Sequence, residues 1–534
     1  MNEPEAAAGP AWVDVRRGLY RDSITLMRIS RGLAERDGVL GALTAMATDL
    51  NLELLSRLGF TAPPDVGPND LVVAIRATDE ATLGGARDVL DAMLTEAPAA
   101  YAPGAPGAPG TPGDDQVPAR TIATAAARAA RSSGIAGTAP TLALVSVPGR
   151  HAFVEAMDAL ESGLNVMIFS DNVPVAEEIL LKDAAARRGL IVMGPDCGTA
   201  VVGGAGLGFA NAVRPGPVGI VAASGTGSQQ VMCLLDAAGV GVSHAIGVGG
   251  RDLSAEVSGR GTLQALAALS ADPATELIVM VSKPPAPPVA ALIREAARRL
   301  TTPVVFAVLG DGDGIGSGAG IRGPGGRHER RAGRDLTAAV EAALAVLGVP
   351  VPSWPSWPAA VPPRPRPGAL RGLFAGGTLC AEALHIAAGT LGTVHSNLPG
   401  RPAGDTGHVM IDFGDDRLTQ GRAHPMIDPS LRLERLAAEL ADPSCSVVLL
   451  DVVLGYAAEP DPAARLAPLI GQAGDTAVVV SLCGTPHDPQ GRDRQAAALR
   501  DAGATVFASN AAAARYAVSL IEVSEHSVIE GHRR

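Results

Sequence analysis

Short apolar runs alternate with amphipathic segments along most of this chain of 534 residues. In the first hundred residues, three apolar runs are each followed by a segment with helical periodicity. The runs are VDVRRGLY, GVLGALTAM and DLVVAIRA, with helices expected from Asp22, Thr48 and Thr78. This alternation predicts a small α+β domain over residues 1–100, either ferredoxin-like or a small open sheet.

Residues 120–213 continue the alternation with longer apolar runs. TLALVSVPG, LNVMIFSDNV and GLIVMGPDCGT are separated by helical segments that begin at His151 and Val175. The order strand, helix, strand, helix, strand implies right-handed parallel crossovers. We therefore predict a Rossmann-like domain in this region.

The remainder of the chain contains one pattern twice. IGVGGRDL at Ile246 corresponds to IDFGDDRL at Ile411, and ADPATELIVMVS at Ala271 corresponds to ADPSCSVVLLDV at Ala441. Each copy continues with a helix and another apolar run, TPVVFAVLG or TAVVVSLCG. Because order and residues are both shared, we interpret residues 214–330 and 369–534 as two flavodoxin-like modules, the second copy of the repeat ending near residue 520.

Proline- and glycine-rich segments separate these parts. Residues 101–119 contain APGAPGAPGTPGDD, and residues 331–368 are expected to form a helix followed by VPVPSWPSWPAAVPPRPRPG. Such composition cannot bury a core, so we interpret both as linkers. The predicted fold class is α/β, with a Rossmann-like segment, two flavodoxin-like modules and a small N-terminal α+β domain.

Composition supports this fold class and narrows the ligands. The chain is 47% hydrophobic but 3% aromatic, with 64 Gly, as expected for aliphatic parallel sheets joined by glycine turns. The net charge is −12 and no basic run is interleaved with aromatics, so we expect a small-molecule substrate and no nucleic acid. No apolar segment reaches about 18 uncharged residues and MNEPEAAAGP lacks a signal pattern, so we expect no membrane contact and a cytoplasmic location. The five cysteines are widely spaced and no HxxxH pair occurs, so we expect no metal.

Two apolar strands run directly into glycine- and hydroxyl-rich turns that begin a helix. They are VGIVAASGTGSQQV and RGLFAGGTLCAEAL, and their candidate anion-binding residues are Ser224, Gly225, Thr226, Gly227, Gly376, Gly377 and Thr378. Glycines allow close backbone approach, and the unpaired amides of a first helical turn attract anions. Turn geometry alone is the alternative, but repetition at equivalent positions favours a paired phosphate site. Neither copy has GxxxxGK[ST] or GxGxxG, which disfavours a P-loop or an ordinary NAD site.

Polar residues at other strand ends are candidates for contact with the substrate. Gly249, Gly250 and Asp252 follow one strand, and Asp412, Asp415 and Asp416 occupy the comparable bend of the second module. These aspartates either form turns or position a magnesium ion or a substrate amide. Three further candidates are Lys283 at the end of VSK and Asp196 and Cys197 in GPDCGT, although turn and core roles are common for these residue types.

Proton transfer needs a titratable group beside the anion site. His424, in the loop GRAHPMIDP, is the best candidate, together with Asp415 and Asp416. A structural or exposed histidine is the alternative.

These motifs together resemble a known superfamily. MGPDCGT, PGPVGIVAASGTG and AIGVGGRDL resemble the alpha subunit of succinyl-CoA synthetase and the wider acyl-CoA synthetase superfamily. Nearly the whole chain, including YRDSITLMRIS, SDNVPVAEEILLK, VSKPPAP, GRAHPMIDP and LLDVVLGY, resembles the FdrA-type branch. The resemblance implies that residues 120–213 form a CoA-binding-type domain and that the two modules are of the CoA-ligase type.

In succinyl-CoA synthetases two helix N-termini hold a phosphohistidine that relays phosphate, and by resemblance Gly225, Thr226, Gly377 and Thr378 belong to such helices. This chain departs from that pattern. Residues 310–326 contain no histidine, and His328 follows in GGRHERR, which is not the Gly-His-Ala-Gly loop. Ser282-Lys283-Pro284 replaces the expected acidic residue, no glycine-rich CoA fingerprint precedes residue 141, and no ATP-grasp domain is apparent.

FdrA-type proteins are associated with purine-ureide nitrogen use, as one component of an oxamate carbamoyltransferase. The resemblance thus implies transfer of a carbamoyl or acyl group to or from phosphate, with phosphate or a carbamoyl or acyl phosphate as ligand and with partner subunits encoded nearby. One alternative is an acyl-CoA ligase that uses CoA and nucleotide with a partner chain. Another is a non-catalytic, anion-binding scaffold subunit.

Overall fold

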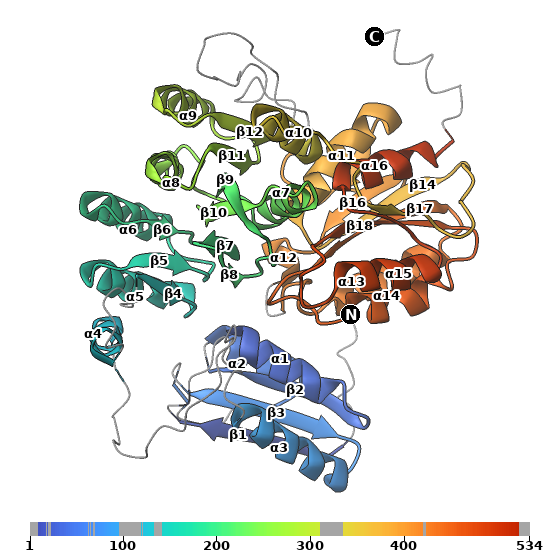
Figure 1. Ribbon diagram of the computed structural model, residues 1–534. Coiled ribbons are helices and arrows are strands. Elements are labelled where there is room, and N and C mark those ends of the chain that lie inside the picture. The colour runs from blue at the N-terminus through green and yellow to red at the C-terminus, as the bar shows by residue number, and fades with distance from the viewer. Residues whose placement is uncertain are drawn as a thin grey trace. The chain divides into compact units, whose positions relative to one another are not determined.

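The computed structural model describes residues 9–17, 19, 23–47, 49–61, 64, 66–67, 70–95, 119, 121–132, 141–309, 335–419 and 423–522. The chain divides into two compact units (Figure 1). The first comprises residues 1–120 with 420–423, and the second comprises residues 121–419 with 424–534. The first predicted linker lies outside the described residues except for residue 119.

The N-terminal unit is a three-stranded antiparallel sheet covered by helices on both faces. The sheet order is β1-β3-β2, with β1 at Ala11–Arg16, β2 at Val39–Met46 and β3 at Leu71–Ala77. Alternate residues of the central strand face opposite sides, so one set packs on α1 (Ser23–Ala34) and α3 (Glu80–Thr95) and the other on α2 (Asp49–Arg57). The three predicted strand–helix units are present, and antiparallel pairing agrees with the ferredoxin-like alternative.

The Rossmann-like region of the second unit is a small parallel sheet with order β4-β5-β6. Its elements follow the predicted alternation: β4 (Leu142–Val145), α5 (Gly149–Glu161), β5 (Asn165–Ile168), α6 (Val175–Arg188) and β6 (Val192–Met193). An additional helix, α4 (Ile122–Ser132), packs on α5.

The first flavodoxin-like module has a parallel sheet in the order β12-β11-β9-β10. The strands are β9 (Pro215–Ala222), β10 (Val242–Gly247), β11 (Leu277–Ser282) and β12 (Val304–Val308). They are joined by α7 (Gly225–Ala237), α8 (Arg260–Ala271) and α9 (Pro287–Arg299), and α10 (Leu336–Val346) packs on α7 and β12.

A hairpin extends this sheet beyond the boundary expected at residue 213. The short strands β7 (Thr199–Val202) and β8 (Ala205–Gly208) pair with each other, and β7 pairs antiparallel with β10. In the structure the sheet of the first module therefore begins at Thr199, and the Rossmann-like sheet ends at β6.

The second module repeats the strand order of the first. Its strands are β14 (Ala369–Phe374), β15 (Val394–Ser396), β16 (His408–Asp412), β17 (Cys445–Val453), β18 (Ala477–Cys483) and β19 (Thr505–Phe507). Its helices are α11 (Gly377–Leu391), α12 (Asp416–Thr419), α13 (Ser430–Ala441), α14 (Pro462–Ile470), α15 (Arg492–Asp501) and α16 (Asn510–Ser519). The order β18-β17-β14-β16 matches β12-β11-β9-β10 of the first module, which agrees with two flavodoxin-like copies, and β19 extends the second sheet beyond β18.

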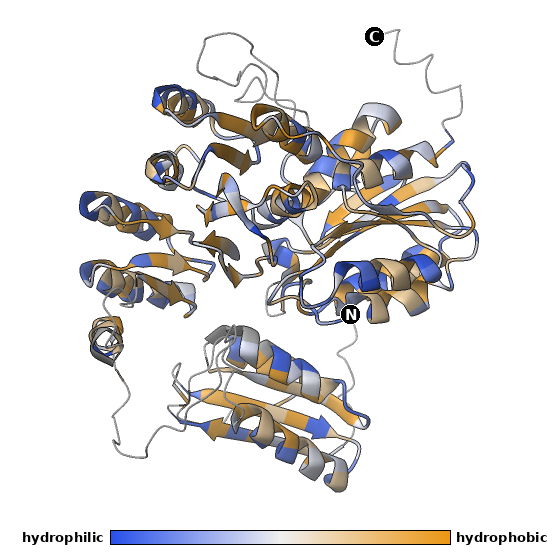
Figure 2. Ribbon diagram, viewed as in Figure 1, coloured by the Kyte–Doolittle hydropathy of each residue, from blue (hydrophilic) through white to orange (hydrophobic). Residues whose placement is uncertain are grey.

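Edge strands complete the second sheet. β15 pairs parallel with β16, and β13 (Ser356–Trp357), from the Pro-rich linker, pairs antiparallel with β19. The long central strand β17 is buried at every position, which agrees with its mainly apolar sequence (Figure 2). Within the described residues, no helix is long and apolar enough to cross a membrane.

Candidate functional site

The N-termini of α7 and α11 face each other, which brings the two predicted anion-binding turns together. Ser224 Oγ and Thr378 Oγ1 are 2.5 Å apart and share a hydrogen bond. A Cβ atom on Gly376 would lie 2.7 Å from Thr226 Oγ1, and one on Gly227 would lie 3.0 Å from Thr378 Cγ2. Glycine at these two positions is therefore what allows the two helices to approach so closely.

Backbone donors remain available at this junction. Ser224 caps α7, because its Oγ accepts from Gly227 N at 3.0 Å. Among the described residues, no acceptor is found for the backbone amides of Gly225, Thr226, Gly377 and Thr378. First-turn amides carry partial positive charge and favour an anion, so the two helices together present the donors that the predicted anion site needs.

Lys283 and Asp412 lie at the N-terminus of α11. A Cβ atom on Gly377 would lie 3.6 Å from Lys283 Nζ and would collide with the Asp412 carboxylate. Asp412 ends β16, and its Oδ1 accepts from Gly414 N at 2.9 Å. Burial raises the pKa of Asp412 to about 7, although Lys283 opposes that rise. A carboxyl group that titrates near neutral pH beside a cation and helix amides is suited to proton transfer.

His424 lies close to Asp412, on the other side of Gly414. A Cβ atom on Gly414 would be 2.9 Å from His424 Nε2 and 3.2 Å from Asp412 Oδ1. Met426 N donates to His424 Nδ1 at 3.2 Å, so the neutral ring carries its proton on Nε2. Burial lowers the pKa of His424 to about 4, so at neutral pH this imidazole is an uncharged hydrogen-bond donor and a weak base.

The neighbouring aspartates are less suited to the expected proton transfer. Arg417 binds both carboxylate oxygens of Asp415, at 2.9 and 3.0 Å, and these bonds lower the pKa of Asp415. The backbone of Asp416 begins α12, and its side chain lies outside the described part. Asp412, which shares their bend, is therefore the better proton donor or acceptor.

Four other candidates lie where a loop of the Rossmann-like domain meets a loop of the first module, away from the helix N-termini. They are Asp196, Cys197, Gly249 and Gly250. Gly194 N donates to Gly247 O at 3.0 Å, and a Cβ atom on Gly249 would collide with Pro195 O. Gly249 has a φ of 87°, so it serves this close approach of the two loops. Cys197 is buried, and desolvation raises its pKa to about 12, which makes it a poor nucleophile. Gly250 and Asp196 are exposed.

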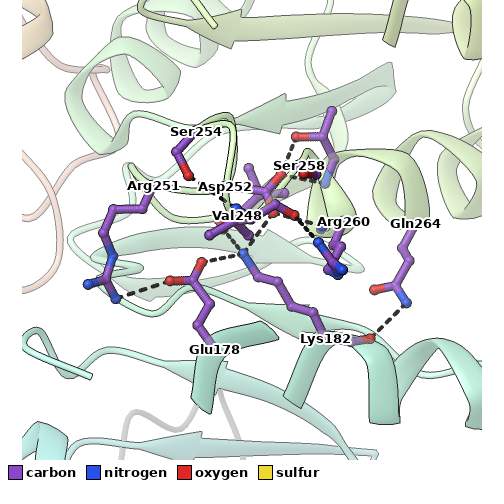
Figure 3. Close-up of polar contacts among 12 residues, drawn as sticks. Glu178, Lys182, Val248, Arg251, Asp252, Ser254, Ser258, Arg260 and Gln264 are labelled. Atoms are coloured by element: carbon purple, nitrogen blue, oxygen red, sulfur yellow. Dashed lines mark hydrogen bonds and ion pairs between the residues drawn. The ribbon is translucent and has the colours of Figure 1, made fainter. Parts of the chain in front are cut away.

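Asp252 is engaged within the protein rather than open to a substrate. Its carboxylate accepts from Lys182 Nζ at 2.8 Å, Gly261 N at 2.8 Å and Thr262 Oγ1 at 2.7 Å (Figure 3). Lys182 also binds Glu178 at 2.7 Å, and both Lys182 and Asp252 have no exposed surface. The expected substrate contact of Asp252 is thus replaced by an ionic connection between α6 and the loop that precedes α8.

Sequence reasoning did not identify the carboxylate beneath the second anion-binding turn. Asp451 accepts from Ala375 N at 2.7 Å, Gly376 N at 2.8 Å and Arg432 Nη1 at 2.7 Å. The Asn397 side chain similarly holds the backbone of Asp412, because its Nδ2 donates to Asp412 O at 2.8 Å and its Oδ1 accepts from Asp412 N at 2.9 Å. Charged residues inside the apolar run CSVVLLDVV and on helix α13 were the available signal for Asp451 and Arg432.

Two family models match separate parts of the chain. The CoA-ligase model matches residues 373–520, and the model described as AllF, heavy metal-associated domain, matches residues 10–108. Residues 10–108 contain neither cysteine nor histidine, which are the ligands that soft heavy metals prefer. The described residues also contain no group of three His, Cys, Asp or Glu side chains placed to hold a metal. Neither finding indicates a heavy-metal site in the described part of this domain.

Curated relatives match the chain at two levels. The Escherichia coli K12 protein YahF, itself uncharacterized, is 36% identical over 522 residues, which cover 93% of this chain and 96% of YahF. The succinate–CoA ligase (ADP-forming) alpha subunit of Methanothermobacter thermautotrophicus is 28% identical over 144 residues, 26% of this chain and 48% of that subunit. The malate–CoA ligase alpha subunit of Methylorubrum extorquens is 26% identical over 35% of this chain and 61% of that subunit. The chain thus spans only about half to three fifths of these two ligase subunits.

A solved structure of a dinucleotide-forming acetyl-CoA synthetase 1 from Ca. Korarchaeum cryptofilum aligns with 72% of this chain and 84% of that chain, at 16% identity and a TM-score of 0.27. A score this low adds nothing to the assignment. The near full-length match to YahF, with the CoA-ligase and AllF-type models at the two ends, is decisive instead. The chain belongs to the FdrA-type family of the acyl-CoA synthetase superfamily.

Proposed function

We propose that this protein is a subunit of an oxamate carbamoyltransferase-type complex, which moves a carbamoyl group between a ureide and phosphate in purine-ureide nitrogen catabolism. The observation that carries the proposal is the pair of helix N-termini joined through Ser224 and Thr378, with Lys283 beside them. Residues 310–326, the region that resembles the phosphohistidine loop, contain no histidine and lie outside the described residues, as does His328. Transfer to free phosphate needs no phosphorylated side chain.

The proposed reaction assigns a role to each part of the junction. Phosphate accepts hydrogen bonds from the backbone amides of Gly225, Thr226, Gly377 and Thr378, and Lys283 balances its charge. A phosphate oxygen attacks the carbamoyl carbon of oxalurate and the carbon–nitrogen bond to oxamate breaks, which gives carbamoyl phosphate and oxamate. The departing nitrogen takes up a proton, which Asp412 supplies from its protonated form, while His424 Nε2 donates a hydrogen bond nearby.

The test is reconstitution with partners. The protein is co-purified with the products of neighbouring genes, and phosphate-dependent cleavage of oxalurate is followed by the appearance of oxamate and carbamoyl phosphate. We expect turnover that requires phosphate and neither ATP nor CoA. Thioester formation that depends on ATP and CoA, without oxalurate cleavage, would reject the proposal.

Acyl-CoA ligation with a partner chain is the second candidate, and the match of residues 373–520 to the CoA-ligase model favours it. In that case nucleotide and CoA sites come from another subunit. An acid-labile phosphoenzyme formed from radiolabelled ATP by the reconstituted complex would support ligation. Phosphate binding without any turnover in that complex would instead favour an anion-binding scaffold.

A further inference from the structure

The second module contains a small pocket beside the candidate anion-binding turn of α11, with about 350 Å³ of space not filled by protein, part of which is open solvent at its mouth. Ala375, which immediately precedes that turn, lines it, and so do Pro425 and Met426 from the loop of His424. Most of the remaining wall is apolar. The polar part of the wall consists of Arg432, Glu459 and Arg465.

Arg432 is the unusual member of this wall. Only 5% of the residue is exposed, and its Nη1 binds the carboxylate and the carbonyl oxygen of Asp451 at 2.7 and 2.8 Å. Its Nε–H is buried and has no acceptor in the described structure. A buried, unpaired guanidinium donor costs free energy, and an acceptor atom supplied by a ligand would remove that cost.

The charges around the pocket indicate which acceptor fits. Arg432 and Arg465 are balanced by Asp451 and Glu459, so the surroundings have no excess positive charge for a second free anion. Glu459 lines the same space, and a carboxylate has lone pairs for more than one donor. A neutral planar group with a carbonyl oxygen on one side and N–H on the other matches this pair.

We propose that this pocket binds the amide group of a small substrate, whose carbonyl oxygen accepts from Arg432 Nε and whose NH₂ group donates to Glu459. This inference deepens the proposed carbamoyl transfer and rests on it for the identity of the substrate. Asp451 connects the two sites, because it binds Arg432 on the pocket side and Ala375 N and Gly376 N at the start of α11. An amide in the pocket is thereby placed next to the turn proposed to hold phosphate.

Methyl NMR of the full chain tests the pocket directly, because Met426 lines it. The methyl signal of Met426 is followed while acetamide, or acetate of nearly the same size and shape, is added. We expect saturable movement with acetamide and at least about fivefold weaker binding of acetate, which lacks the donor and is repelled by Glu459. An unmoved Met426 signal, or equal affinity for the two probes, would overturn the proposal.

Two variants localise the effect. Glu459→Gln should reduce the preference for acetamide over acetate to within about twofold, because the glutamine carbonyl can accept from acetamide and its NH₂ group can donate to acetate. Arg432→Lys should weaken acetamide by about tenfold, since a lysine ammonium cannot replace the Nε–H geometry. Arg371→Lys is the matched control, because Arg371 is also a buried arginine, paired with Glu439, but it does not line the pocket. Acetamide should move the Met426 signal of this variant as it does in the wild type.

The two proposals fail separately. Binding of acetamide at Met426 without oxalurate cleavage in the reconstituted complex would reject carbamoyl transfer and leave the pocket standing. Oxalurate cleavage with no response at Met426 would reject the pocket alone.

Discussion

Asp412 couples the protonation of the site to the stability of the fold. Burial raises its pKa to about 7 in the folded chain, whereas an unfolded aspartate titrates near 4. The folded state therefore retains a proton that the unfolded state releases, so the contribution to stability is fully present below about pH 4 and is lost as the pH rises through about 7. An asparagine at this position has no proton to exchange in this range and would show no such dependence.

We therefore expect Asp412→Asn to gain stability relative to the wild type as the pH rises from 4 to 8, by up to roughly 4 kcal/mol. Urea unfolding at several pH values measures this difference. Asp415→Asn is the control with the opposite sign, because Arg417 lowers the pKa of Asp415. The contribution of Asp415 to stability is therefore present at neutral pH and is lost only as the pH falls below the ordinary pKa of an aspartate. A difference between Asp412→Asn and wild type that does not change with pH would contradict the assignment.

Lys283 should set the pH at which Asp412 works. Its positive charge lowers the pKa of Asp412, against the larger effect of burial. In the reconstituted complex, Lys283→Met should therefore move the alkaline limb of the pH–rate profile to higher pH and also raise the phosphate concentration needed for half-maximal rate. Arg417→Met is the matched control, because that cation pairs with Asp415, and an equal displacement of the limb in both variants would contradict a specific role for Lys283.

Residue identity alone allowed part of this site to be predicted. The glycine and hydroxyl turns and Lys283 were identifiable because their chemistry and their position after a strand are visible in the sequence. Asp412 was placed in the right bend, but its importance depends on burial, which a sequence does not display. Asp252 was predicted to contact substrate, but the structure gives it a partner within the protein. An aspartate in a glycine-rich turn gives no sign that Lys182, seventy positions earlier, binds its carboxylate.

At the scale of elements, the first glycines of α7 and α11 differ in how closely a neighbouring strand packs on them, which predicts different effects of substitution. A Cβ atom on Gly377 would collide with the Asp412 carboxylate, whereas one on Gly225 would make ordinary contact with Thr199 Oγ1 at 3.5 Å. Gly377→Ala should therefore reduce turnover by at least about tenfold, and Gly225→Ala should change it by less than about threefold. Steady-state kinetics of the reconstituted complex measures both.

Thermal unfolding provides the control for that series. If Gly377→Ala lowers turnover while its melting temperature stays near that of Gly225→Ala, the effect arises at the junction rather than from loss of the fold. Equal activity in the two variants would contradict a role in turnover for the close packing of Gly377 on Asp412.

The arrangement of elements was more accessible to sequence reasoning than the contacts between them. The repeated pattern gave two modules, and both have the same central strand order because each apolar run is a buried parallel strand. The hairpin β7–β8 was assigned to the neighbouring domain, since strands of four residues with glycines between them leave little periodicity. The partner of an edge strand is chosen by tertiary packing, which is not local information.

At the scale of the whole molecule, the buried cluster of Lys182, Glu178 and Asp252 joins the Rossmann-like domain to the first module (Figure 3). Lys182 also donates to Val248 O at 3.0 Å, and Arg251 pairs with Glu178 at 3.0 Å. Removal of the central cation leaves two carboxylates in a dehydrated space with one partly exposed arginine nearby. The penalty for such an uncompensated charge usually exceeds the net value of the intact pair.

Lys182→Met should therefore destabilise the chain by about 3–5 kcal/mol, although methionine nearly preserves the volume of the side chain. Hydrogen exchange measures this locally, and the loss of protection should concentrate in α6 and α8 and spare the second module. Lys283→Met is the matched control, since Lys283 is exposed, and it should change stability by less than about 1 kcal/mol. The double variant Lys182→Met/Asp252→Asn should recover part of the loss, because it removes one of the stranded charges. Protection in α6 and α8 that is unchanged by Lys182→Met would show that apolar packing, rather than this ionic cluster, holds the two domains together.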